Sequence, residues 1–310
     1  MWIAVAILVT LIVLVLLFCY LMAFYLVYPH DHSIENGKQL MDERGFWRDF
    51  DAMEKKAYIV TAADGYQLHA QVIFAKEPSN QYVILSHGYS CNWCFCVKYV
   101  HIFRQLGFHC IVYDNRGHGL NAPSICTVGL REAADLIDVI ADTRCRFGDG
   151  ISIGLHGESM GAALTAIALS QKPDVEFAVL DCGYARLMDV VQHRMKRLFG
   201  IPKVLCYPAS LMCRLFFGFA PWQAKPAKAL EDNIIPVCLI HGQDDDFVTC
   251  DHSEALYRSN KGYVELHIFP GAEHTRSIDT DEAAYQAILE QFLAKCRQGA
   301  LSNLDKLEIR

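Results

Sequence analysis

The stretch ISIGLHGESMGAALTAIAL, residues 151–169, decides the fold. Its first six residues are mostly apolar and predict a buried strand, and the residues after Gly161 predict a helix. Ser159 lies in the turn between them, flanked by Gly157 and Gly161. Glycines allow the chain to turn tightly there and leave the serine hydroxyl exposed above the strand. We therefore interpret Ser159 as a nucleophile rather than as an ordinary turn residue.

Short apolar runs alternate with helix-length segments on both sides of this stretch. A hairpin with strands at 58–61 and 67–74 comes first, joined at Asp64-Gly65. We expect further strands at 82–86, 110–113, 151–156, 177–181, 237–241 and 264–269, and helices at 95–106, 131–147, 162–170, 253–258 and 282–296. This order predicts an α/β fold with a mostly parallel, doubly wound sheet, whose functional loops follow the carboxyl ends of the strands.

The alternation stops between about residues 184 and 230, which we call the inserted segment. It begins with helical periodicity and continues into the very apolar sequence ASLMCRLFFGFAPW, residues 209–222. One interpretation is an insertion packed against the core. The other is a helical cap over the active site that supplies an apolar substrate pocket, and both can hold together.

The chain begins with 27 residues, Trp2 to Tyr28, that carry no charge. A helix of this length spans about 40 Å, enough to cross a hydrocarbon core of about 30 Å. A cleaved signal peptide is the alternative, but no basic residue precedes the segment and no small-residue cleavage site follows it. A buried core helix would show a polar face. We predict a single-pass transmembrane anchor that places the protein in the lipid bilayer.

Several features bear on compartment and partners. Lys38, Arg44 and Arg48 follow the anchor and no basic residue precedes it, which favours a cytoplasmic catalytic portion. The 13 cysteines are odd in number, and several lie in apolar runs as buried thiols would, which favours a reducing compartment. A net charge of -7 without a basic cluster argues against nucleic acid as a partner.

The domain organisation follows from these boundaries. We expect an anchor at 1–28, a linker with a short helix at 29–56, a catalytic domain at 57–296 and a frayed tail at 297–310.

A nucleophilic serine needs a base, and the base needs a carboxylate to hold its tautomer. His274 follows the last predicted strand and is the candidate base, because His267 lies within that strand and His252 falls near the start of a helix. Three neighbouring residues compete as the acid, namely Asp244, Asp245 and Asp246. Spacing alone does not separate them.

Five motifs together resemble a known family. They are LSHGYS (85–90), YDNRGHG (113–119), GESMG (157–161), PVCLIHGQDDDFV (236–248) and GAEH (271–274). In this order they resemble α/β-hydrolases of the bacterial serine aminopeptidase-like or prolyl-oligopeptidase-like group, in the branch with an N-terminal membrane anchor. The resemblance covers roughly residues 57–296 and implies the α/β-hydrolase fold.

The resemblance also implies roles for individual residues. It selects Asp245 as the acid and the backbone N–H of Tyr89 as one oxyanion donor, with Gly88 allowing the close turn before it. The second donor is the N–H of Met160, directly after the nucleophile. His87 is expected to brace its loop. The YDNRGHG loop departs from the family pattern because Asn121 replaces a serine, and we expect Arg116 to bond neighbouring loops there.

These residues predict two-step acyl transfer by Ser159, His274 and Asp245, with no metal and no organic cofactor. Cys91, Cys94 and Cys96 lack a second pair at zinc-ligand spacing. The anchor and the apolar inserted segment favour an apolar acyl substrate, as in a carboxylesterase or lipase-like enzyme. A peptidase or amidase, a thioesterase or acyltransferase, and a membrane-tethered binding protein without catalysis are the alternatives.

Overall fold

The computed structural model describes residues 1–29 and 32–297. The tail predicted at 297–310 lies outside the described residues apart from Arg297, which ends the last helix. One eight-stranded sheet has the order β1-β2-β4-β3-β5-β6-β7-β8. Its strands are β1 (Lys55–Thr61), β2 (Gln67–Ile73), β3 (Gln81–Ser86), β4 (His109–Tyr113), β5 (Ser152–Glu158), β6 (Phe177–Asp181), β7 (Val237–Gly242) and β8 (Val264–Phe269).

The sheet is mostly parallel. β2 pairs antiparallel with β1 and with β4, and the pairs from β4 through β3 to β8 are all parallel. The fold class predicted from the sequence is confirmed. β1 begins at Lys55, three residues before the predicted strand, because Lys55 still pairs with Ile73 of β2.

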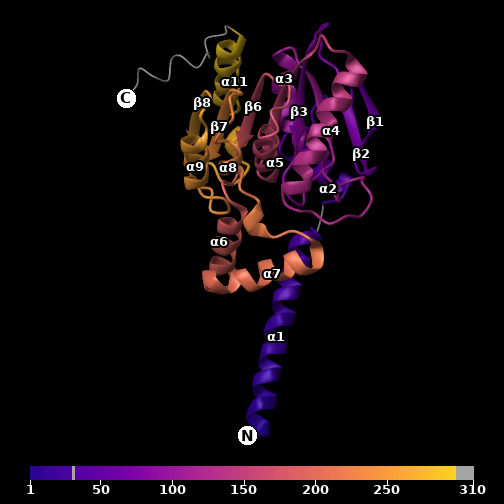
Figure 1. Ribbon diagram of the computed structural model, residues 1–310. Helices are drawn as coiled ribbons and strands as arrows, with labels where there is room; N and C mark the ends of the chain where they lie inside the picture. The colour runs from indigo at the N-terminus through magenta and orange to yellow at the C-terminus, as the bar shows by residue number, and fades with distance from the viewer. Residues whose placement is uncertain (30–31, 298–310) are drawn as a thin grey trace.

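Helices cover both faces of the sheet (Figure 1). Successive strand side chains point to opposite faces, so Val83 and Leu85 join one core cluster and Tyr82 and Ile84 join the other. The first face is covered by α2 (Ile34–Glu43), α3 (Val97–Gln105), α10 (Ser277–Thr280) and α11 (Glu282–Arg297). The second is covered by α4 (Leu130–Phe147), α5 (Met160–Leu169) and α9 (Asp251–Ser259).

The helix predicted at 95–106 begins differently. Residues Trp93–Cys96 form a 3-10 turn before α3, because the side chain of Asn92 accepts a hydrogen bond from the amide of Cys94 at 3.0 Å. This early cap starts the helical path two residues before the predicted position.

The inserted segment is helical. It contains α6 (Leu187–Phe199), α7 (Cys206–Phe217) and α8 (Pro226–Ala229), with 3-10 turns at Lys203–Leu205 and Pro221–Gln223. In Figure 1, α6 and α7 lie below the carboxyl edge of the sheet, beside the upper end of the N-terminal helix.

The N-terminal helix α1 (Trp2–Val27) projects away from the sheet (Figure 1). It is the one helix of the described residues that is long and apolar enough to cross a membrane by itself. Only Cys19, Ala23 and Val27 of this helix are buried. Its C-terminal end is fixed to the sheet domain, since the amide of Cys126 donates to the carbonyl of Val27 at 2.8 Å.

Candidate active site

Ser159 lies in the sharp turn between β5 and α5. Its backbone has a positive φ of 56°, a conformation that costs energy for any residue with a side chain. The flanking glycines are required by close approach. A Cβ at Gly157 would lie 2.2 Å from the carbonyl oxygen of Gly161, and a Cβ at Gly161 would lie 2.0 Å from that of Ser86. The turn therefore depends on these glycines, as the sequence pattern predicts.

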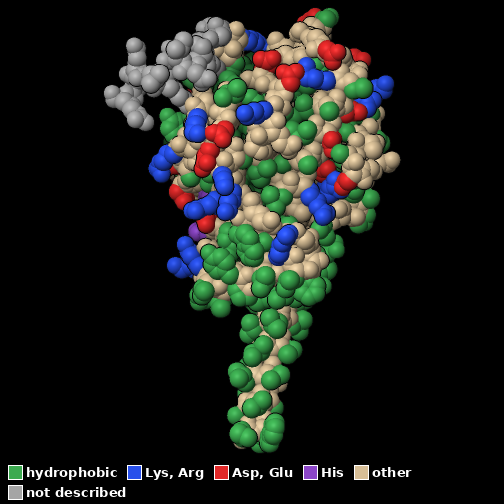
Figure 2. Space-filling view, in the orientation of Figure 1, with side chains coloured by type: hydrophobic (Ala, Val, Ile, Leu, Met, Phe, Trp, Pro, Cys, Tyr) green, Lys and Arg blue, Asp and Glu red, His purple; other side chains and the backbone are tan. Residues whose placement is uncertain are grey.

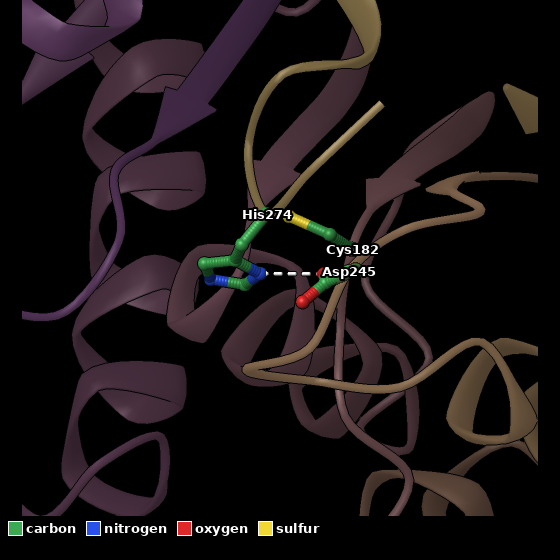
Figure 3. A group of neighbouring side chains, drawn as sticks. All are labelled: Cys182, Asp245 and His274. Carbon is green, nitrogen blue, oxygen red and sulfur yellow. Dashed lines mark hydrogen bonds and ion pairs between the residues drawn. The ribbon is translucent and has the colours of Figure 1, made fainter. Parts of the chain in front are cut away.

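The structure brings Ser159, His274 and Asp245 into one hydrogen-bonded chain. Ser159 Oγ lies 2.9 Å from His274 Nε2, and His274 Nδ1 lies 2.6 Å from Asp245 Oδ2. Figure 3 shows the second of these contacts, with the imidazole facing the carboxylate. Asp245 follows β7 and His274 follows β8, so three parallel strands present the three groups at one edge of the sheet.

The geometry separates the three candidate acids. Asp245 is 4% exposed, and its carboxylate meets His274. Asp244 and Asp246 are exposed. Asp246 forms an ion pair with Arg197 of α6 instead. Asp245 is thus the member of the group that is in position to orient the imidazole.

The surroundings of Asp245 keep it ionised. Burial alone would raise the pKa of its carboxyl, but hydrogen bonds from His241 and His274 outweigh burial and hold the pKa well below its ordinary value. The other oxygen, Oδ1, accepts the amides of Phe247 at 2.9 Å and Val248 at 2.8 Å. An ionised Asp245 accepts a hydrogen bond from the proton that His274 carries on Nδ1, which leaves Nε2 free of a proton and facing Ser159.

Cys182 completes a group that has the ligand types of a metal site. The ligand atoms of Cys182, Asp245 and His274 lie within 4.8 Å of one another (Figure 3). Metals bind the thiolate form of cysteine, whereas burial raises the pKa of the Cys182 thiol well above its ordinary value. The hydrogen bonds among Ser159, His274 and Asp245 account for the placement of the other two groups without a cation.

The predicted oxyanion donors lie beside Ser159. A Cβ at Gly88 would lie 3.4 Å from the Ser159 Cβ, so the loop carrying Tyr89 passes directly over the nucleophile. Met160 is the first residue of α5, where amides have no acceptor within the helix and the helix dipole is positive. Tyr89 and Met160 line the same cavity as Ser159.

His87 braces the Tyr89 loop. Its Nδ1 lies 2.8 Å from the carbonyl oxygen of Gly88, and its Nε2 accepts the amide of Asn115 at 2.9 Å. Burial lowers the pKa of His87 to about 3, so the ring is neutral. Both ring nitrogens are engaged by the backbone, which agrees with the structural role expected for this histidine.

The YDNRGHG loop also bonds its neighbours. Arg116 reaches Asp135 at 2.6 Å and Asp64 at 2.9 Å. Asn121, which replaces the family's serine, accepts the amide of His69 at 2.8 Å. The thirteen cysteines of the described residues are thiols, with no disulfide among them.

A buried polar network lies beneath the nucleophile and was not predicted from the sequence. Lys98 of α3 is fully buried, and its ammonium lies 2.8 Å from Glu158, the residue before Ser159. The same ammonium donates to the carbonyl of Thr275, beside His274, at 3.0 Å. Lys98 thus connects the nucleophile turn to the histidine loop. A lysine within the apolar run VKYVHIF was the signal available in the sequence.

The network continues to Asp181 at the end of β6. The Tyr99 hydroxyl lies 2.9 Å from the Glu158 carboxylate and 3.1 Å from the Asp181 carboxyl, which share its one proton, and Tyr285 donates to Asp181 at 3.0 Å. Burial and the charge of Glu158 raise the pKa of Asp181 to about 6. This carboxyl lies close to the nucleophile turn, since the Ser159 amide donates to the Asp181 carbonyl at 2.8 Å.

A cavity of about 650 Å³ opens onto Ser159 and His274. Its walls come mainly from the end of α1, the inserted segment and the catalytic loops, with Leu40 and Arg44 of α2 and its C-cap adding to them. Most of the lining side chains are apolar, among them Phe18, Met22, Leu26, Leu187, Val190, Val191, Met195, Leu198, Leu205 and Phe247. The inserted segment thus contributes to a pocket at the candidate active site, together with a helix that the sequence analysis assigned only to the membrane.

The inserted segment also touches the acid and base loops. The Phe247 ring stacks on the His274 imidazole with centroids 4.9 Å apart, and the guanidinium of Arg194 lies 4.3 Å from the Phe247 ring. His193 Nε2 lies 3.1 Å from the carbonyl oxygen of Asp246. These contacts hold α6 against the loops that carry Asp245 and His274.

Comparison with known proteins agrees with this architecture. The family model described as serine aminopeptidase, S33, matches residues 77–215. An uncharacterized protein of Bacillus subtilis, YqkD, is 28% identical over 247 residues, covering 79% of this chain and 81% of that protein.

Solved structures show the same fold. An esterase of Pyrococcus furiosus is 24% identical with a TM-score of 0.67, covering 80% of this chain and 94% of that one. The acylaminoacyl peptidase of Pyrococcus horikoshii is 18% identical with a TM-score of 0.59, covering 77% of this chain and 41% of that one. Together with the sheet order, these likenesses show that the chain has the α/β-hydrolase fold, and over residues 77–215 it is similar to the serine aminopeptidase family.

Proposed function

We propose that this protein is a membrane-anchored hydrolase that cleaves carboxylic esters with Ser159, His274 and Asp245 as its catalytic triad. The observation that carries the proposal is the continuous path of hydrogen bonds from Ser159 Oγ through the imidazole to a buried, ionised carboxylate. A serine hydroxyl becomes an effective nucleophile only with such a base.

The reaction proceeds in two acyl transfers. His274 Nε2 takes the hydroxyl proton while Ser159 Oγ attacks the carbonyl carbon, and the amides of Tyr89 and Met160 stabilise the resulting oxyanion. The imidazolium then gives its proton to the leaving alkoxide, which departs as the alcohol. In the second transfer His274 takes a proton from water as the water oxygen attacks the acyl-enzyme. The imidazolium then returns this proton to Ser159 Oγ as the carboxylic acid leaves.

The apolar lining of the cavity favours an ester with an acyl chain over a polar peptide. Each methylene that the cavity buries contributes about 0.8 kcal/mol, or roughly a fourfold gain in binding. The similarity to the Pyrococcus furiosus esterase is compatible with this substrate class. The similarity to the Pyrococcus horikoshii acylaminoacyl peptidase covers less than half of that larger enzyme.

A chain-length series tests the substrate class. We expect kcat/KM for p-nitrophenyl esters to rise by up to about fourfold per added methylene from two to eight carbons, until the cavity is filled. Aminoacyl p-nitroanilides should be cleaved far more slowly, and Ser159→Ala should abolish turnover of both. Faster cleavage of the anilides would favour the peptidase alternative and contradict the ester assignment.

The anchoring part of the proposal concerns α1. Its length and apolar composition support a membrane span, and Lys38, Arg44 and Arg48 after it favour a cytoplasmic catalytic portion. Cys145 is exposed on α4 and provides a reporter of sidedness. A membrane-impermeant maleimide should label Cys145 in inverted vesicles and not in intact cells, with Cys145→Ser as the control. Labelling in intact cells would contradict the orientation.

A further inference from the structure

The inserted segment exposes apolar side chains on the side away from the sheet. Those of α7, of the end of α6 and of the 3-10 turn between them form what we call the α7 apolar face: Leu198, Phe199, Val204, Leu205, Tyr207, Leu211, Leu215 and Phe216. Leu198 and Leu205 of this face also line the cavity. Four of them, Phe199, Val204, Leu215 and Phe216, are more than 60% exposed. Figure 2 shows hydrophobic side chains gathered where Figure 1 draws α6 and α7, and continuing along α1. Exposed apolar patches of this kind mark protein or membrane contacts.

The charges around the α7 apolar face are mostly basic. Residues 187–217 contain five basic side chains against one acidic side chain, Asp189, a net charge of +4 within a chain of net charge -7. Lys196, Lys203 and Arg214 are exposed there, and Arg197, which is also exposed, is paired with Asp246. Lysine and arginine near an anionic lipid surface are attracted to it, and each adds to binding.

The depth of α7 follows from its packing on α1. About 20 residues of helix cross a hydrocarbon core of about 30 Å, so a span that starts at Trp2 ends near Leu21. Tyr20 lies at this boundary. The centroid of its ring is 5.0 Å from that of Phe216 and 6.2 Å from that of Phe217. Tyr28, beyond the boundary, also contacts Phe217 at 6.1 Å. α7 is therefore held at the level where hydrocarbon meets headgroups.

We propose that the α7 apolar face docks on an anionic lipid leaflet and is a second membrane contact besides α1. The occupant is the bilayer rather than another protein, because the face is continuous with the membrane helix, basic at its rim and at the depth of the headgroups. This inference rests on the membrane anchoring proposed above. It also places the cavity between α1 and α7 beside the acyl chains of membrane lipids, which gives the enzyme direct access to them.

Quenching by brominated lipids tests the docking on the full chain in nanodiscs that contain phosphatidylcholine and phosphatidylglycerol. We expect the added emission of Phe216→Trp to be quenched by lipids brominated near the headgroup end of the acyl chain. Ile59→Trp is the matched control, since Ile59 is an exposed apolar residue on the edge strand β1. Equal quenching of the two variants would overturn the proposal.

Charge-reversal variants test whether the face prefers anionic lipids. Lys196→Glu with Lys203→Glu should reduce the quenching of Phe216→Trp at least twofold in discs with phosphatidylglycerol, whereas Lys56→Glu on β1 should leave it unchanged. Hydrogen exchange of the wild-type protein is a second measurement, and it needs no substitution. We expect amides 203–217 to be protected, more strongly with phosphatidylglycerol than without it. Unprotected amides would also contradict the proposal. If the amides are protected, Phe216→Trp is not quenched and each disc holds two chains, the face would instead contact a second copy of the chain.

The outcomes separate this inference from the proposed function. Neither the quenching nor the hydrogen-exchange measurement depends on hydrolysis. A protein that docks on the membrane but is inactive would therefore contradict only the esterase assignment. Extraction of the chain from membranes by alkaline carbonate would show that the anchoring has failed. A chain that resists extraction while Phe216→Trp remains unquenched would contradict the docking alone.

Discussion

Replacement of Lys98 by methionine should destabilise the protein strongly. The Lys98 side chain is fully buried and that of Glu158 is 7% exposed, and the two charges are 2.8 Å apart. Lys98→Met keeps most of the volume but leaves the Glu158 carboxylate buried without its cation. Removing one partner of a buried ion pair costs about 3–5 kcal/mol, whereas removing both together costs little. For a domain of this size the loss corresponds to a melting temperature roughly 6–20 °C lower.

The matched control is the double variant Lys98→Met with Glu158→Gln. It removes both charges and keeps an acceptor for the Tyr99 hydroxyl, so most of the lost stability should return. The hydrogen bond from Lys98 to the Thr275 carbonyl remains absent in both variants. Thermal unfolding in detergent micelles measures the stability lost with the ion pair. The kcat for a short soluble ester measures the effect of losing the hydrogen bond to Thr275.

We expect the double variant to melt close to wild type while its kcat stays several-fold lower, because the loop that carries His274 has lost its tie to α3. A melting temperature for Lys98→Met within 2 °C of wild type would refute the assignment of Lys98 and Glu158 as a buried pair. A double variant with wild-type kcat would refute the positioning role of Lys98.

Three other predictions follow from the site. Asp245→Asn should lower kcat by about 10⁴-fold, because the imidazole loses the acceptor that holds its tautomer, whereas Asp244→Asn should change ester hydrolysis less than twofold; the reverse order would move the acid. The pKa of Asp181 is about 6 in the fold against 3.8 unperturbed, so wild type loses about 2 kcal/mol of stability relative to Asp181→Asn as the pH rises from 4 to 7. Parallel stability curves for these two proteins in urea would contradict that raised pKa. The Tyr89 hydroxyl donates to the α1 carbonyl of Leu26 at 2.9 Å, so Tyr89→Phe should lower the melting temperature by roughly 1–6 °C, and an unchanged value would show that this tie is not stabilising.

The elements nearest the nucleophile could be predicted from the sequence because their patterns are local. The strand before Ser159, the two glycines and the helix after it are adjacent in the chain, and each has a steric reason for its residue type. The choice of Asp245 over its neighbours depended on the family resemblance. The structure supplies a physical basis, since only one of the three carboxylates is turned inward toward His274.

Contacts between distant segments could not be predicted in this way. Lys98 and Glu158 are 60 positions apart, and neither position belongs to a periodic pattern that would pair them. The attachment of α1 to the catalytic loops uses backbone carbonyls, which every residue has, so no sequence signal marks it. The composition of α1 indicated a membrane helix, but its part in lining the cavity became visible only in three dimensions.

Covalent labelling of Ser159 tests the central claim most directly. We predict that a fluorophosphonate adds one adduct to the wild-type protein, that peptide mass spectrometry places it on Ser159, and that Ser159→Ala stays unlabelled. His274→Ala should label much more slowly, because the hydroxyl has lost its base. An unlabelled wild-type protein, or an adduct that persists in Ser159→Ala, would contradict the claim that Ser159 is the activated nucleophile.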